Sequence, residues 1–372
     1  MPKGTTPQFA VHRDDIVREL ASAVAAVEKK TTIPILGNVM IEATGSELKI
    51  TATDLEIGIA TACVASVKEE GVFTLPAKRL LDYLRLLPAG SVDFSIGSNL
   101  WASIKSDRSR TRIPGMSHES FPELPAGGEP VCRIKLSALA YLASRTTFCV
   151  SREESRFSLN GSLLEIHEDG TARMVATDGH RLGIANAKCE PSGTFKLLVP
   201  RKVLTMIPHW QAAASEDITV VVSADDNHIF FDLGGRHVLS RKMSGNFPDY
   251  QRVLPKELPH AVDFKREEMA GTLSRVRAFA DERARAVKLH FIPGEGVKVF
   301  SSVMESGESE ELVPCEVASE MQTGFNADYV LQHLGAIEAE TVQISYRDAN
   351  NAAVLRPVGA EDSLCVIMPM RV

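Results

Sequence analysis

The sequence predicts an α+β protein made of three similar domains in tandem. The segment KITATDLEIGIATAC at 49–63 returns as RMVATDGHRLGIANAKC at 173–189, which places Asp54 and Asp178 124 residues apart. A weaker third copy follows, in which VKVFSS at 297–302 takes the place of the first strand. Because the chain has 372 residues, three such repeats fill it almost completely. A period this long excludes a solenoid, whose repeats are much shorter.

Matching stretches close the first two repeats and predict the domain boundaries. ESFPELP at 119–125 and GNFPDYQRVLP at 245–255 occupy equivalent places. We therefore expect domains at 1–126, 127–256 and 257–372.

The elements of one repeat can be predicted in order from the first copy. Residues 13–27 carry apolar side chains at helical spacing, and residues 47–64 alternate like two strands joined by a short turn. Pro76 suits the first turn of a second helix, whose leucine stripe ends before Pro88. Residues 91–113 are again strand-like. Helix, strands, helix and strands in each copy predict helices packed on antiparallel sheet.

Composition places the chain among ordinary globular proteins. Hydrophobic residues make up 44% and charged residues 24%, and the net charge is −7. This charge argues against a protein coated in positive charge, although it leaves room for a local basic surface. The first fifteen residues, MPKGTTPQFAVHRDD, lack the apolar core of a signal peptide. We therefore expect a cytoplasmic protein.

The six cysteines predict neither disulfides nor a metal site. None forms a C-x-x-C pair. Cys63, Cys189 and Cys315 recur 126 residues apart and so occupy equivalent strand positions. Reduced, buried thiols are expected for a chain with this much apolar material.

The stretch VATDGHRL at 175–182 contains residue types found at acid/base and metal sites. However, Asp178 has an equivalent in Asp54, and a shared Thr-Asp is typical of a turn in which the carboxylate binds its own backbone. No second histidine lies at ligand spacing, and no nucleophile or phosphate-loop motif is present. A hydrolase or nuclease using Asp178, His180 and a metal remains the less favoured alternative.

Basic residues recur on equivalent predicted helices. A solvated helix face explains any one of them, but recurrence favours a phosphate-facing surface, which needs only spread Lys and Arg. The residues are Lys29, Lys30, Lys78, Arg79, Arg85, Arg201, Lys202, Arg275, Arg277, Arg283 and Arg285.

Six motifs in order along the chain resemble the bacterial DNA polymerase III beta subunit family, the sliding clamps. They are IPILGN at 33–38, ATDGHRL at 176–182, VPRK at 199–202, GNFPDYQRVLP at 245–255, GFNADYVL at 324–331 and VIMPMRV at 366–372. The resemblance implies the DNA clamp fold, with three domains per chain, two chains in a head-to-tail ring, helices lining the hole and antiparallel sheets outside. It implies a non-catalytic processivity subunit without a cofactor or metal.

The same resemblance implies partners and site residues. The partners are double-stranded DNA bound without sequence preference, the DNA polymerase III alpha subunit, the clamp loader, other proteins with clamp-binding motifs, and a second copy of the chain. A peptide-binding pocket would be formed by Arg156, Leu159, Thr177, Gly179, His180, Arg181, Leu182, Pro248, Arg252, Val253, Asn326, Tyr329, Val366, Ile367, Met368, Pro369, Met370 and Arg371. Lys30, Lys78, Arg79, Phe157, Arg201 and Lys202 would face DNA, and Ile113 and Phe279 would lie in the dimer interface.

Three departures from the family pattern accompany the resemblance. MPKGTTPQ precedes Phe9, Phe157-Ser158 stands where an aromatic pair is common, and Thr111 stands where an apolar interface side chain is common. The resemblance does not separate a housekeeping clamp from a specialised second copy.

Overall fold

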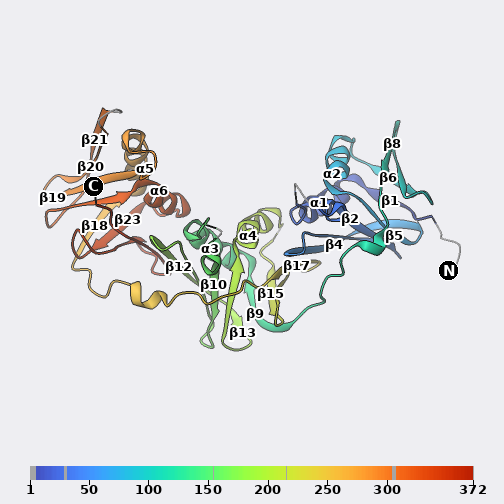
Figure 1. Cartoon of the computed structure of the whole chain (residues 1–372), viewed down its shortest axis with the longest axis horizontal. Helices are drawn as coiled ribbons and strands as arrows, with labels where there is room; N and C mark the ends of the chain where they lie inside the picture. Colours follow the sequence, from blue (N-terminus) through green and yellow to red (C-terminus); the bar gives the residue numbers. More distant parts are fainter. Residues whose placement is uncertain (1–5, 29–31, 154, 215, 304–306, 372) are drawn as a thin grey trace. The chain divides into compact units, whose positions relative to one another are not determined.

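The computed structural model describes residues 6–28, 32–153, 155–214, 216–303 and 307–371. The chain forms two compact units (Figure 1). The first unit contains Met1–Arg133 with Ile218–Lys242, and the second contains Ile134–Asp217 with Met243–Val372.

The three repeats share one order of elements, namely strand, helix, strands, helix and strands. The first repeat contains β1 (Gln8–His12), α1 (Arg13–Val24), β2 (Asn38–Thr44), β3 (Glu47–Thr53), β4 (Ile57–Glu69), β5 (Gly71–Pro76), α2 (Ala77–Leu86), β6 (Ser91–Ile96), β7 (Trp101–Ser106) and β8 (Ser109–Pro114). The second contains β9 (Glu129–Lys135), α3 (Leu136–Thr146), β10 (Gly161–Ile166), β11 (Thr171–Thr177), β12 (Arg181–Lys188), β13 (Glu190–Pro191), β14 (Phe195–Pro200), α4 (Arg201–Ala213), β15 (Thr219–Ala224), β16 (His228–Asp232) and β17 (Arg236–Arg241). The third contains β18 (His260–Lys265), α5 (Arg266–Val276), β19 (Ala286–Ile292), β20 (Gly296–Val303), β21 (Gly307–Pro314), β22 (Met321–Asn326), α6 (Ala327–Ala336), β23 (Thr341–Tyr346), β24 (Ala353–Pro357) and β25 (Ser363–Ile367).

This order confirms the predicted α+β layout and adds a strand that the sequence analysis missed. The missed strand opens each repeat, as β1, β9 and β18. In β1 the buried side chains are Phe9 and Val11, two positions apart, and five residues are too few for their period to stand out.

The sheets run from one repeat into the next. In the first unit the strand order is β15-β16-β17-β4-β1-β6-β7-β8, and Leu239 of β17 lies opposite Gly58 of β4. In the second unit the order is β14-β10-β11-β12-β25-β24-β23-β18, and Leu182 of β12 lies opposite Val366 of β25. We call the β17–β4 pairing the first junction and the β12–β25 pairing the second junction.

Helices bury their predicted apolar stripes. Ile16 and Leu20 of α1 and Leu80 and Leu84 of α2 are fully buried. None of the six cysteines, all of which lie in the described ranges, forms a disulfide; Cys63, Cys132, Cys149 and Cys365 are buried, whereas Cys189 and Cys315 are half-buried.

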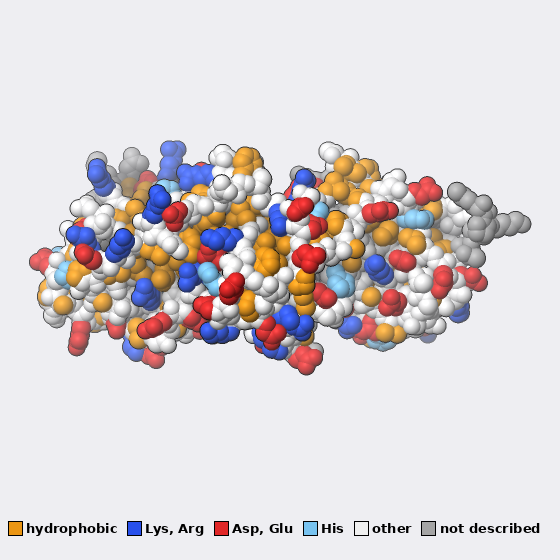
Figure 2. Space-filling view, turned by 90° about the horizontal axis from the view of Figure 1, so that it is seen from below, with side chains coloured by type: hydrophobic (Ala, Val, Ile, Leu, Met, Phe, Trp, Pro, Cys, Tyr) orange, Lys and Arg blue, Asp and Glu red, His pale blue; other side chains and the backbone are white. Residues whose placement is uncertain are grey.

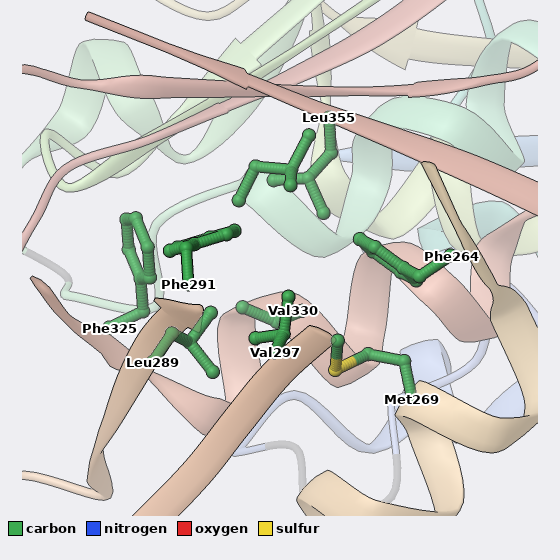
Figure 3. A pocket seen from close by; sticks show the side chains of 9 residues that line it. Phe264, Met269, Leu289, Phe291, Val297, Phe325, Val330 and Leu355 are labelled. Carbon is green, nitrogen blue, oxygen red and sulfur yellow. The ribbon is translucent and has the colours of Figure 1, made fainter. Parts of the chain in front are cut away.

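The core of the third repeat contains a small apolar cavity (Figure 3). Phe264, Met269, Leu289 and Phe325 are among its lining residues, and its volume is about 10 Å³. A cavity of this size is at the lower limit for one water molecule, and a dry apolar lining offers that water no partner. It is therefore a packing defect rather than a ligand site. Along the described residues, no helix is both long and apolar enough to cross a membrane.

Candidate functional site

The turn between β11 and β12 is built by two polar side chains. Asp178 Oδ1 accepts hydrogen bonds from the backbone N–H groups of His180 and Arg181, each at 3.0 Å. The Thr177 hydroxyl accepts from the Gly179 N–H at 3.1 Å and donates to the Arg181 carbonyl at 2.7 Å. Gly179 has φ of +89°, a conformation that glycine adopts without strain.

The first repeat contains the same turn between β3 and β4. Asp54 Oδ1 accepts from the N–H groups of Glu56 at 3.0 Å and Ile57 at 2.7 Å. The Thr53 hydroxyl accepts from the Leu55 N–H and donates to the Ile57 carbonyl. The prediction of a structural turn Asp is confirmed in both copies. A carboxylate engaged in this way is not a free acid/base group.

Arg181 links the turn to the third repeat. Its Nε donates to Asp178 Oδ2 at 3.0 Å. Its guanidinium lies 4.1 Å from the ring centroid of Tyr329 on α6 and 5.5 Å from that of Phe148. The side chain is only 7% exposed. The Arg181 guanidinium is thus engaged with the turn and with two rings beneath the surface, and its contact with a peptide stays a prediction.

The start of α6 is fixed by its own cap. Asn326 Oδ1 accepts from the N–H groups of Asp328 at 2.9 Å and Tyr329 at 3.2 Å. Asn326 Nδ2 donates to the Ala284 carbonyl. The capped helix holds the Tyr329 ring over Arg181 and 6.5 Å, between centroids, from the His180 ring.

The chain end returns to this turn. After β25 the Met368 N–H donates to the His180 carbonyl at 2.9 Å, and the Met370 N–H donates to the Gly324 carbonyl at 2.8 Å. These two bonds attach the end of the chain to the second repeat and to β22 of the third. Met368 remains 47% exposed.

An apolar cluster underlies the linker between the second and third repeats. Leu182, Val354 and Val366 belong to it, and Tyr250 of the linker packs into it. The Tyr250 hydroxyl donates to Glu165 at 2.7 Å, which pins the linker to the sheet. Phe247 and Leu254 of the linker pack against the cluster from outside, whereas Val253 is 55% exposed.

The predicted pocket residues fall into three groups by exposure. The exposed ones are Arg156, Gly179, His180, Pro248, Arg252, Val253, Met368 and Arg371; the half-buried ones are Leu159, Asn326, Tyr329, Pro369 and Met370; the buried ones are Thr177, Arg181, Leu182, Val366 and Ile367. The structure therefore brings exposed side chains from the turn, the linker and the chain end onto a buried support. Sequence reasoning missed Phe148, which has no local signal because its partner Arg181 lies 33 positions away.

The predicted DNA-facing residues lie mainly on helices. Lys78 and Arg79 on α2 and Lys202 on α4 are exposed, and Phe157 is 70% exposed. Arg201 is half-buried; burial, with Arg152 nearby, lowers its pKa. Lys30 lies outside the described residues. Figure 2 shows one face on which Lys and Arg are mixed with Asp and Glu.

The two predicted interface residues behave differently. Phe279 is 37% exposed and accessible. Ile113 is only 2% exposed, and it lies opposite Ala102 within the core of the first repeat. Its side chain is therefore packed inside its own chain, and its place in a dimer interface stays a prediction.

A buried histidine lies beside the second junction. His333 of α6 is 2% exposed, and its ring is 6.0 Å from the Phe148 ring. Burial, with Arg145 nearby, lowers its pKa to about 3, so the ring is neutral at pH 7. Within the described ranges, no cluster of three or more His, Cys, Asp or Glu could hold a metal ion.

Comparison with known families gives consecutive matches along the chain. The models described as DNA polymerase III beta subunit N-terminal, central and C-terminal domain match residues 7–125, 133–249 and 251–371. The beta sliding clamp of Pseudomonas putida is 31% identical over 369 residues, covering 98% of this chain and 99% of that protein. The beta sliding clamp of Caulobacter vibrioides is also 31% identical, with 98% and 100% covered.

Solved structures agree with these matches. The sliding clamp (DNA polymerase III subunit beta) of Pseudomonas aeruginosa bound to griselimycin superposes with a TM-score of 0.92 at 30% identity, covering 99% of this chain and 100% of that one. The clamp of Bartonella birtlesii bound to griselimycin gives 0.93 at 30% identity with the same coverage.

Proposed function

The chain belongs to the DNA polymerase III beta subunit family, and from this premise we propose that its second junction binds peptide segments of replication partners. The chain is a sliding clamp of DNA polymerase III, a non-catalytic processivity factor with the clamp fold of three tandem domains. The family implies DNA and polymerase partners and dimerisation, and a two-chain ring is consistent with it. A metal-dependent hydrolase is not favoured.

One observation carries the peptide-site proposal. The chain end, through Met368 and Met370, is hydrogen-bonded to both the turn and β22, and the Met368 side chain stays exposed, as does Val253 of the linker that packs on the same sheet through Tyr250. Flexible methionines adapt to different apolar anchors, and His180 and Arg252 supply polar partners at the rim. The expected ligands are peptide tails of the DNA polymerase III alpha subunit, the clamp loader and other clamp-binding proteins.

Deleting Met368–Val372 tests this proposal. We expect clamp-binding peptides and griselimycin, which is bound by the Pseudomonas aeruginosa clamp, to bind the full chain and to lose binding to the truncated chain by at least about ten-fold. The fold should survive, because the deletion starts after β25 ends at Ile367. Calorimetry gives the affinities and circular dichroism gives the fold. Equal affinity of the full and truncated chains would refute the site.

The DNA contact is proposed to be electrostatic and blind to sequence. Spread Lys and Arg on helices hold phosphates without reading bases, so a clamp can slide. Reversing Arg201 and Lys202 to Glu should lower the salt dependence of DNA retention by about one unit of slope per lost phosphate contact. The matched control reverses Lys105 and Lys188, two exposed lysines on strands. An equal effect of both pairs would remove α4 from the DNA surface.

The dimer contact is proposed to join two sheet edges of opposite charge. β8 ends its sheet and exposes Arg110 and Arg112, whereas β21 ends the four-stranded sheet β21-β20-β19-β22 and exposes Glu308 and Glu310. Unpaired strand edges of this kind pair readily with another chain. Phe279 adds apolar area beside β21, because its ring lies so near Gly307 that a side chain at that position would contact it.

Phe279→Ala should therefore give a folded monomer in sedimentation experiments at nanomolar concentration. Ile113→Ala, in contrast, should lower stability, because it opens a cavity inside the first repeat. A Phe279→Ala variant that remains dimeric would show that the pairing rests on the strand edges alone.

Two coarser features complete the proposal. The domain boundaries are proposed near residues 126 and 256, within the segments that join β8 to β9 and β17 to β18. The working compartment is proposed to be the cytoplasm, where the DNA of a bacterial replication clamp lies.

A further inference from the structure

The third repeat contains a groove beside the chain end, where Pro369, Met370 and Arg371 of the predicted peptide site meet residues outside that site. Its volume is about 400 Å³, and its lining includes Lys288, Gln322, Gly324, Asn350, Met370 and Arg371. None of the residues that line it is acidic. Because Lys288 and Arg371 line the groove and no carboxylate does, the groove is suited to a negatively charged group.

The floor of the groove is fixed by strand register. Lys288 of β19 lies opposite Gly324 of β22, so no side chain from that position covers the lysine stem. The Met370 N–H donates to the Gly324 carbonyl at 2.8 Å, which places the chain end along the same edge. The groove is therefore part of the folded third repeat rather than a gap between loops.

Another side of the groove is formed by the turn at residues 348–351, in which the Asp348 carboxylate accepts hydrogen bonds from the turn itself. Asp348 Oδ1 accepts from the N–H groups of Asn350 at 2.8 Å and Asn351 at 3.1 Å, and Asp348 Oδ2 accepts from Asn351 Nδ2 at 2.7 Å. The Thr323 hydroxyl donates to the Ala349 carbonyl at 3.0 Å and ties the turn to β22. The Asp348 carboxylate is thus held by its own turn.

Neither groove cation is neutralised within the part of the chain that the structure describes. No ion pair joins Lys288 or Arg371 to a described carboxylate, whereas Lys298 on the neighbouring strand β20 lies 3.2 Å from Glu310. Exposed cations that lack partners attract a carboxylate more effectively than paired ones, because no existing pair must be broken.

We propose that this groove binds an acidic side chain of the partner peptide, at a residue flanking the apolar segment that occupies the second junction. The proposal rests on the proposed peptide site, with which the groove is continuous through Met370 and Arg371. Lys288 attracts the carboxylate and the amides of Gln322 and Asn350 can donate to it. The groove thereby selects among partners that share the same apolar anchors.

The test measures binding of a fluorescent clamp-binding peptide with either Asp or Asn at each flanking position. At one flank, the Asp peptide should bind the wild-type chain about five-fold more tightly than the Asn peptide at low salt, as expected for a partly exposed charge pair. The advantage should shrink at 0.5 M salt. Lys288→Gln should bring the Asp/Asn ratio close to one, whereas the control Lys298→Gln should leave that ratio unchanged.

A charge swap keeps the test decisive if the effect is small. Lys288→Glu should reverse the preference, so that a peptide with Lys at the same flank binds more tightly than the Asp peptide. A ratio near one at both flanks for the wild-type chain overturns the groove proposal. The proposal also fails if the preference for Asp persists in the Lys288→Gln variant. It fails as well if amidation of the peptide C-terminus alone abolishes the preference, because the groove would then bind the C-terminal carboxylate of the peptide. If the Asn peptide does not bind the wild-type chain at all, the peptide site itself has failed.

Discussion

The turn between β3 and β4 and the turn between β11 and β12 share one pattern of hydrogen bonds and differ in the side chains that follow the Asp. In both, a Thr-Asp pair makes the same four hydrogen bonds. In both, the carbonyl two residues after the Asp accepts an N–H from the next repeat, Arg241 for Glu56 at 2.8 Å and Met368 for His180 at 2.9 Å.

The side chains then diverge. The position of Gly179 is taken by Leu55 in the first turn, with φ of +76° and 52% exposure. A leucine in the left-handed region is strained, whereas glycine is not. The second turn also adds Arg181, which reaches across to Tyr329. The comparison teaches that the shared Thr-Asp turn makes both junctions, whereas the residues after the Asp distinguish the candidate site.

The two junctions also hold their arginines differently. At the first junction Arg236 of β17 donates to Glu19 of α1 at 2.8 and 2.9 Å, so the carboxylate comes from a helix. At the second junction Arg181 takes its carboxylate from the turn itself, through Asp178. Asp178 therefore also binds the arginine of its own turn, whereas the residue at the Arg181 position of the first turn is Ile57.

The largest expected effect follows from this second role. Asp178→Ala should destabilise the fold by about 3 to 5 kcal/mol, because it leaves the Arg181 guanidinium buried without its charge partner. Asp54→Ala should cost only about 1 kcal/mol, for the lost turn bonds. Urea denaturation compares the two variants. The double variant Asp178→Ala with Arg181→Met should recover part of the loss, and equal costs for the two single variants would contradict the comparison.

Acid should weaken the second junction before the first. The unfolded chain protonates His333 near pH 6.5, but the folded chain does so only near pH 3. Stability is therefore lost as pH falls below about 6.5, by about 2 kcal/mol at pH 5. Hydrogen bonds from Arg236, Thr61 and Arg18 lower the pKa of Glu19 despite its burial, so that the first junction weakens only below about pH 4.5.

Hydrogen exchange at pH 7 and pH 5 can follow both junctions in one sample. Amides of α6 should lose protection at pH 5, and amides of α1 should not. His333→Leu should remove the difference at α6. A loss of protection at α1 first would reverse the predicted order.

The smallest expected effect comes from exchanging the residues at the left-handed position. Gly179→Leu should destabilise by about 1 to 2 kcal/mol through backbone strain, and its Cβ would lie 3.0 Å from Arg156 Nη1. Leu55→Gly should stabilise by up to about 1 kcal/mol, because the strain disappears. Thermal unfolding measures both. A Leu55→Gly variant less stable than the parent would show that this leucine contributes packing that outweighs the strain.

Local patterns in the sequence could predict the features that depend on neighbours in the chain. The turn role of Asp54 and Asp178 followed from their repetition, and the helices followed from apolar spacing. Residues far apart in the sequence were beyond such reasoning. Phe148, Arg181 and Tyr329 come together only because β12 pairs with β25. No local pattern in the sequence predicts that pairing.

The interface residue Ile113 illustrates the same limit. On an edge strand the side chains alternate between the two faces, and sequence alone does not decide which face is already covered. In β8 the covered face carries Ile113, whereas Arg110 and Arg112 point outward.

The number of peptide sites per chain tests the central comparison most directly. Titration of the full chain with griselimycin or a clamp-binding peptide in a calorimeter should give one site per chain. Gly179→Leu should weaken that site by at least about ten-fold, while Leu55→Gly should leave both stoichiometry and affinity unchanged. Two equivalent sites per chain, or a site that Leu55→Gly weakens and Gly179→Leu does not, would contradict the assignment of peptide binding to the second junction alone.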